Sequence, residues 1–205
     1  MRDLEKALAD ITAIRTQMAR GIEFRGYGPA TIAATGLAAF AAAGIQARWV
    51  AEPEADVLAY LALWIATATL SVVLIGIEMV LRSRRIHTVL ADEMIHAAIE
   101  HFVPAGVAGA LLTFVIYRFA PPNLWMLPGL WQIVFSLGLF AACRSLPRPM
   151  FGVAVWYLAA GLASLAFASG PHAFSPWAMG VPFGIGQLAM ALIVYRSGGA
   201  SDAEA

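Results

Sequence analysis

The chain alternates long apolar segments with short polar ones. Six continuous apolar runs extend over residues 29–47, 57–81, 102–117, 124–143, 150–168 and 175–195. A helix needs about 20 predominantly apolar residues to cross the hydrocarbon core of a bilayer. Because no water reaches that core, each segment must pair its own backbone groups, which favours helices. The pattern therefore predicts six transmembrane helices, and residues 88–101 should extend the third one as a continuous helix.

The composition supports this prediction. The 205 residues are 60% hydrophobic and 13% charged, whereas soluble domains carry about 25% charged residues. Among the 13 basic and 13 acidic residues, only Glu78 falls inside an apolar run. We expect an all-α fold, a polytopic membrane helical bundle at residues 29–196. A cytosolic amphipathic segment at residues 1–28 should precede the bundle, and a disordered tail at residues 197–205 should follow it.

The distribution of positive charge predicts the orientation in the membrane. With six spans, both termini and every second loop lie on one side, and that side holds most of the basic residues: Arg2, Lys6, Arg15, Arg20, Arg25, Arg82, Arg84, Arg85, Arg144, Arg148 and Arg196. The opposite loops hold only Arg48 and Arg118. By the positive-inside rule, both termini should face the cytosol. Trp49, Trp125 and Trp177 flank the outer span ends, as in an interfacial aromatic belt.

Several classes of protein are disfavoured. A net charge of zero offers no concentrated basic face, so we expect no nucleic acid partner. The single Cys143 cannot form an intrachain disulfide. The segments between the runs are too short for a soluble catalytic domain, and the chain has no motif for nucleophilic catalysis or phosphate binding. We therefore expect no catalytic residue, no metal and no cofactor, and the chain is predicted not to be an enzyme.

The N-terminal segment has an amphipathic pattern. Its apolar residues fall close to one stripe of a helix: Leu4, Leu8, Ile11, Met18 and Ile22. Such a helix can lie on the lipid bilayer surface, fold back on the cytosolic loops or bind a partner helix. Residues 1–28 are therefore a candidate contact for a cytosolic protein partner.

A polar cluster is predicted at the cytosolic side of the second and third spans. Its candidate members are Glu78, Arg82, Glu93, His96 and Glu100. Glu93 and His96 have the Glu-x-x-His spacing of di-iron bundles, but it occurs once, so a solvated helix face is the expected interpretation. Glu78 is an intramembrane acid and hence a functional candidate. Pairing with Arg82, four residues on, is the simpler explanation.

Span six contains an interrupted helical pattern. Pro182 lies between Gly180 and Gly184, and Gln187 follows near the expected bilayer centre. Broken helices often mark binding sites in transporters. A packing kink is one interpretation, and the other is a ligand pocket formed by Trp64, Gln132, Pro182 and Gln187. Small residues four apart, such as Gly180 and Gly184, also let helices pack closely. The packing can be within one bundle or between copies, so the sequence leaves open whether the protein forms a homo-oligomer.

Several short stretches resemble an uncharacterised family of small bacterial six-span integral membrane proteins. They are Ile14-Arg15, Gly26-Tyr27-Gly28, Ala108-Gly109-Ala110-Leu111-Leu112-Thr113, Leu127-Pro128-Gly129-Leu130-Trp131 and Phe183-Gly184-Ile185-Gly186. In that family position 187 is more usually His, so Gln187 departs from it. The resemblance implies the architecture and a multi-pass location in the bacterial cytoplasmic (inner) membrane. It implies no activity and no functional residue.

Two functional hypotheses follow from these patterns. The first is a non-enzymatic regulatory, sensory or scaffolding membrane module that engages a cytosolic partner through residues 1–28 and the 82–101 segment. The second is a carrier or binding protein for a neutral or lipid-like small molecule. The midplane without charge favours an uncharged ligand for the second hypothesis and disfavours an ion pump.

Overall fold

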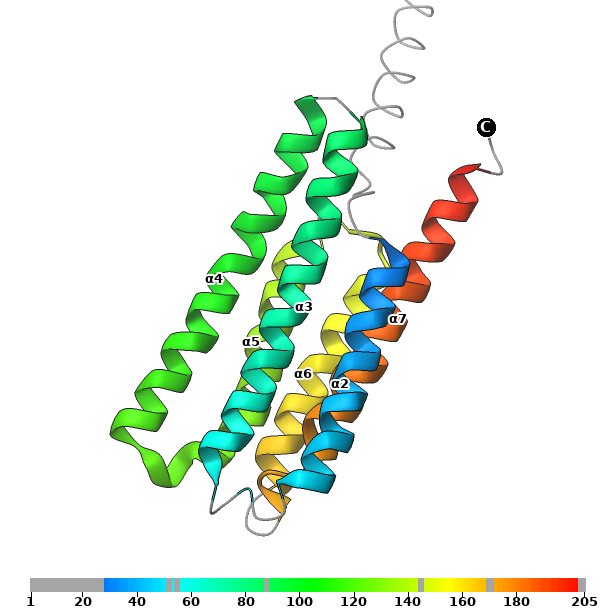
Figure 1. Ribbon diagram of the computed structural model, residues 1–205. Coiled ribbons are helices and arrows are strands. Elements are labelled where there is room, and N and C mark those ends of the chain that lie inside the picture. Colours follow the sequence, from blue (N-terminus) through cyan, green and yellow to red (C-terminus); the bar gives the residue numbers. More distant parts are fainter. Residues whose placement is uncertain are drawn as a thin grey trace, which may run out of the picture.

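The computed structural model describes residues 28–50, 53, 56–86, 89–143, 146–168 and 172–202, and side chains within residues 82–99, 101 and 198–202 are left aside. This part of the chain is all-helical (Figure 1). Its elements are α2 (Pro29–Trp49), α3 (Val57–Ile86), α4 (Val89–Phe119), η1 (Pro121–Met126), α5 (Leu127–Ala142), α6 (Met150–Phe167) and α7 (Pro176–Asp202). Six segments are long and apolar enough to span a membrane, which confirms the predicted fold class.

The helix bounds agree with the apolar runs and extend two of them. α4 is continuous from Val89 to Phe119, as predicted from residues 88–101. α7 continues to Asp202, beyond position 196, where the pattern had placed the end of the bundle. Residues 1–27 lie outside the described residues, so the amphipathic N-terminal helix stays a prediction. α2 begins and α7 ends at the same end of the bundle (Figure 1), which we call the proximal end. The opposite end, where α2 ends, α3 begins, η1 lies and α7 begins, is called the distal end (Figure 1).

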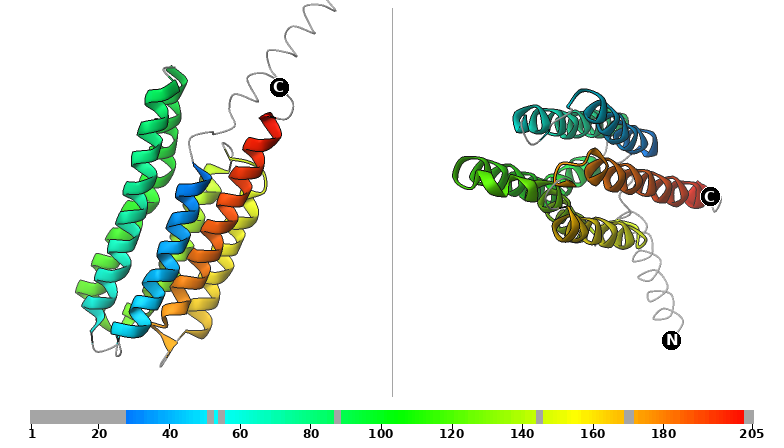
Figure 2. Two further views of the ribbon diagram at one scale, coloured as in Figure 1. Left: turned by 45° about the vertical axis from the view of Figure 1, so that its right-hand side comes forward. Right: turned by 90° about the horizontal axis from the view of Figure 1, so that it is seen from below.

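The helices pack into a compact group with a more exposed side. α2 packs along α7, and α5 packs along α6, while α4 contacts α5 and α3 contacts α2 (Figure 2). Only 6% of the α4 span and 17% of the α3 span is buried, compared with 39% for the α2 and α7 spans. α3 and α4 therefore present most of their apolar surface outward, where a bilayer would cover it.

Glycine residues allow the closest helix contacts. Gly129 of α5 and Gly161 of α6 face each other, and a Cβ atom on either would lie 2.7 Å from the other's carbonyl oxygen. On α7, Gly184 packs against the ring of Phe40, and a Cβ atom on Gly36 of α2 would lie 3.1 Å from the Gly184 carbonyl oxygen. Small residues let the two backbones approach closely. In lipid the hydrophobic effect does not favour contact between helices, so the van der Waals packing gained by this approach drives their association.

Two buried apolar clusters form the core. The distal cluster includes Tyr60, Trp64, Leu127 and Phe174, and the proximal cluster includes Tyr157. The half-buried Phe183 of α7 packs against both clusters. Phe135, Tyr157 and Phe183 stack on one another, with ring centroids 4.7 to 5.6 Å apart. The core is therefore continuous along α7, on the inner side of the helix that carries the predicted break.

Candidate functional site

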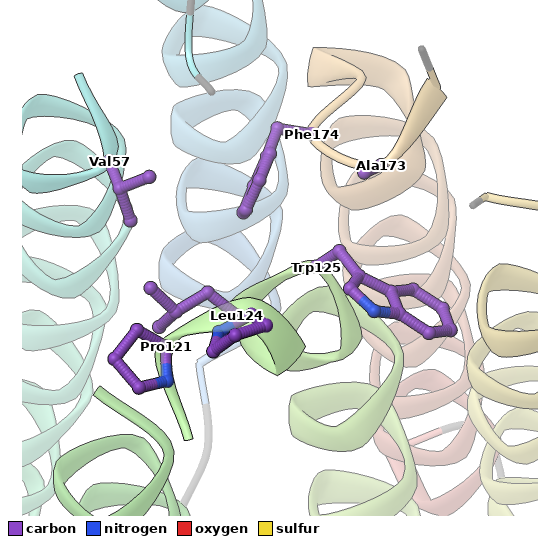
Figure 3. Close-up of a pocket in the computed structure, with 7 residues that line it drawn as sticks. Val57, Pro121, Leu124, Trp125, Ala173 and Phe174 are labelled. Carbon is purple, nitrogen blue, oxygen red and sulfur yellow. The ribbon is translucent and has the colours of Figure 1, made fainter. Parts of the chain in front are cut away.

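A pocket opens at the distal end, where three segments meet. It has a volume of about 270 Å³ and lies between the start of α3, η1 and the turn before α7 (Figure 3). The described residues that line it have mostly apolar side chains: Val57, Pro121, Pro122, Leu124, Trp125, Ala173 and Phe174. Leu124, Ala173 and Phe174 are buried and form the inner wall, whereas the two prolines are exposed at the mouth.

The local sequence explains why a pocket forms here. Pro121 and Pro122 have no backbone N–H, so they end α4 and start the short η1 turn instead of continuing the helix. η1 then sets α5 beside α4, and the Trp125 ring points away from Val57 at the start of α3 (Figure 3). A connection of this kind cannot fill the space between helix ends as closely as a helix fills the core.

Among the residues that the structure describes, no charged side chain lines the pocket, and Asp56 and Arg118 lie near it in the chain. The Asp56 carboxylate accepts the backbone N–H of Ala59 at 3.0 Å and so caps α3. The Arg118 guanidinium lies over the ring of Phe119, 5.6 Å from its centroid. The described lining is thus uncharged, and an ionised ligand against these side chains would lose hydration without compensation.

A buried hydrogen-bond chain fixes the inner wall of the pocket. The Trp64 indole N–H donates to the Gln46 side-chain oxygen at 2.7 Å, and the Gln46 amide donates to the Phe174 carbonyl oxygen at 2.6 Å. Gln46 is 1% exposed and Trp64 is 3% exposed. These bonds join α2, α3 and the turn before α7, and they hold the backbone of Phe174 in place.

One polar atom in this region has no partner. Tyr60 of α3 is fully buried, and its hydroxyl group has no hydrogen-bond partner among the described residues. Its ring packs edge-to-face on the ring of Phe174, with centroids 4.9 Å apart. A buried hydroxyl group without a partner costs about 1–3 kcal/mol.

The proline in α7 is compensated by a side chain from α5. Pro182 has no N–H, so the Ala178 carbonyl oxygen one turn earlier loses its helical donor. The Gln132 amide donates to that oxygen at 2.9 Å. The Pro182 carbonyl oxygen in turn accepts the Trp156 indole N–H of α6 at 3.0 Å. The predicted break is therefore a packed position in a continuous helix, held from two neighbouring helices.

We expect Gln132 and Pro182 to be energetically coupled. Gln132→Leu leaves the Ala178 carbonyl oxygen without a donor and should lower the free energy of unfolding by about 1–3 kcal/mol. In a Pro182→Ala background the new N–H group can supply the missing bond, so the same change should cost about 1 kcal/mol less. Reversible unfolding of the four variants in mixed micelles measures this coupling. Strictly additive costs would contradict the assignment.

The four residues of the predicted ligand pocket have separate polar contacts, and the pocket itself stays a prediction. Gln132 and Pro182 are linked through the Ala178 carbonyl oxygen, but Trp64 is bonded to Gln46. Gln187 packs against Gly36 of α2 and is the polar neighbour of the Tyr157 hydroxyl group, although no aligned hydrogen bond joins the two. None of the four lines the distal pocket.

The predicted cytosolic polar cluster is described only in part. The Glu78 carboxylate lies directly against Gly28, where α2 begins. A negative charge at a helix N-terminus is favourable, because the backbone N–H groups there lack helical partners. Glu100 is exposed on α4, and the side chains of Arg82, Glu93 and His96 lie outside the described part. Contact with the α2 terminus thus adds a structural explanation for an acid inside an apolar run.

The thiol of Cys143 offers little reactivity. Cys143 follows α5 at the proximal end and is half-buried, and burial raises the pKa of its thiol. Near neutral pH the group is therefore protonated, and the thiolate is the nucleophilic form.

Sequence reasoning missed the residues that line the distal pocket. They belong to three connections and helix ends that are far apart in the chain. Apolar residues at such positions form no sequence pattern that marks them as pocket residues. The Pro121-Pro122 pair followed by Trp125 marks an irregular connection next to the interface, and that was the available signal. Gln46 was missed as well, although a polar residue near the end of an apolar run is visible in the sequence.

The comparisons with known proteins add no relative. No family model, no curated protein and no solved structure matches the chain.

Proposed function

We propose that this protein is a non-enzymatic membrane protein that binds an uncharged, lipid-like small molecule in its distal pocket. The observation that carries the proposal is the uncharged lining of a pocket of about 270 Å³ at one end of a membrane bundle. Small-molecule sites are concave and mostly apolar, with volumes of about 300–1,000 Å³, so this pocket lies near the lower limit. This proposal is the second of the two sequence-based hypotheses, with the ligand site placed at the distal end of the bundle.

The size of the pocket restricts the ligand. A dry apolar cavity of about 150 Å³ accepts benzene. The distal pocket has room for a molecule roughly twice that size, such as a medium-length alkyl chain or one end of a longer lipid. Burial of apolar surface contributes about 25 cal/mol per Å², which favours an alkyl group over a polar solute. With the termini in the cytosol, the pocket would open on the outer side of a bacterial inner membrane.

The cytosolic partner hypothesis rests on other parts of the chain. Residues 1–27 and the side chains of residues 82–99 lie outside the described residues. A partner that binds through residues 1–28 and the 82–101 segment therefore stays a prediction, and it is compatible with a ligand site at the opposite end.

Filling the pocket should weaken binding. Val57→Phe enlarges a lining residue, and Leu58→Phe is the matched control, because Leu58 is the next residue of α3 and is 61% exposed. The protein is labelled with 5-fluorotryptophan and placed in lipid nanodiscs, and the fluorine resonance of Trp125 is assigned by its loss in Trp125→Phe. Decane should shift that resonance to saturation in the wild type and in Leu58→Phe, and Val57→Phe should weaken this response at least tenfold.

A shift that grows in proportion to the decane content of the bilayer, with the same slope in all variants, would show that the probe reports on lipid alone. That result would overturn the proposed site.

A further inference from the structure

Tyr60 packs against Phe174, a residue that lines the distal pocket. Tyr60 is on the same face of α3 as Val57, one turn further along, and Val57 lines the pocket. Helical side chains lean toward the N-terminus of their helix and cover the preceding turn. Since α3 begins at the distal end, this tilt directs the phenol ring toward Val57 and the pocket.

The ring of Phe174 contacts both Tyr60 and the pocket. Phe174 lines the pocket and packs edge-to-face on Tyr60, with ring centroids 4.9 Å apart. The backbone of Phe174 is fixed by the bond from Gln46 to its carbonyl oxygen. A rotation of the Phe174 side chain would leave this backbone bond in place.

The buried side chains of Gln46 and Trp64 are already paired. Trp64 and both ends of the Gln46 amide are engaged in the hydrogen-bond chain, whereas the Tyr60 hydroxyl group is buried without a partner among the described residues. A phenol group can donate a hydrogen bond, and a donor that finds no acceptor in an apolar interior is unfavourable. A ligand oxygen that accepts this proton would remove the penalty.

We propose that Tyr60 is the polar contact of the distal pocket, and that the ligand is an uncharged amphiphile with a carbonyl oxygen, as in a ketone or an ester. This inference rests on the proposed function, because it assigns the ligand class of the same site. The alkyl part of the ligand occupies the space among Val57, Leu124 and Trp125, and its carbonyl oxygen accepts the Tyr60 O–H after Phe174 rotates.

Two probes of equal size test the assignment. Decane and 2-nonanone have the same number of non-hydrogen atoms, but only the ketone can accept a hydrogen bond. Each is titrated into the labelled protein in nanodiscs, with its concentration given as the mole fraction in the bilayer, and the Trp125 resonance is followed. Tyr60→Phe removes only the hydroxyl group, which has no partner among the described residues, so the variant should fold as the wild type does.

Tyr60→Phe should weaken the binding of 2-nonanone about three- to tenfold, which corresponds to one net hydrogen bond, and should leave the binding of decane unchanged. Equal effects on both probes, or no effect on the ketone, would overturn the role of Tyr60 while the pocket itself stands. If neither probe saturates in the wild type, the proposed function fails and the inference fails with it.

Discussion

Gly161→Leu should prevent α5 and α6 from packing and lower the free energy of unfolding by more than about 3 kcal/mol. A side chain at this position meets the Gly129 carbonyl oxygen, and the first added atom alone would lie 2.7 Å from it. Backbone atoms of a packed helix cannot move aside as a flexible side chain does. The overpacking must therefore separate α5 from α6, which breaks the contact between these two helices.

Gly152→Leu is the matched control for this change. Gly152 lies on the same helix, is exposed, and has no heavy atom within 4 Å of an added Cβ atom. A leucine there should be neutral or slightly stabilising, because glycine costs about 1 kcal/mol in a helix. Thermal unfolding of both variants in the same detergent, followed by loss of the monodisperse species, measures the difference. Equal midpoints would contradict the close approach of α5 and α6.

Gln46→Leu should have the second-largest effect on stability. The change leaves two buried groups without partners, the Trp64 indole N–H and the Phe174 carbonyl oxygen. Each unmade bond costs about 1–3 kcal/mol, so the loss should exceed that of a variant with one orphaned group. It should also loosen the turn before α7, which forms the inner wall of the distal pocket.

Adding Trp64→Phe to Gln46→Leu separates these contributions. The double variant has no orphaned indole N–H, so it should recover about 1 kcal/mol relative to the sum of the two single changes. Unfolding of the four variants by denaturant in micelles gives the coupling. A Gln46→Leu variant as stable as the wild type would show that the hydrogen-bond chain contributes nothing.

The fold could be predicted from the sequence because the bilayer limits the choices. An apolar run of about 20 residues has one stable conformation in hydrocarbon, so α2, α6 and α7 follow directly from the hydropathy pattern. The pattern could not show which helices pack together. That pairing depends on single glycines such as Gly129 and Gly161, and glycines at other positions of the same helices, such as Gly152, face open space.

The candidate site could be predicted only in its chemistry. A midplane without charge favoured an uncharged ligand, and the distal pocket has the same character. Its position could not be predicted, because Pro182 gave the stronger signal. That proline has a structural explanation in the bond from Gln132 to the Ala178 carbonyl oxygen. A proline inside a helix gives the same sequence pattern whether a ligand or a side chain bonds to the carbonyl oxygen that it leaves free.

Native mass spectrometry tests most directly whether the distal pocket binds a ligand. The full chain is released from nanodiscs that are made with lipids of the membrane in which it was expressed. The wild type and Leu58→Phe should each retain an uncharged lipid-like molecule in a one-to-one ratio, and Val57→Phe should lose it. A bare protein mass in all three variants, or an adduct that Val57→Phe retains equally, would contradict a ligand site in the distal pocket.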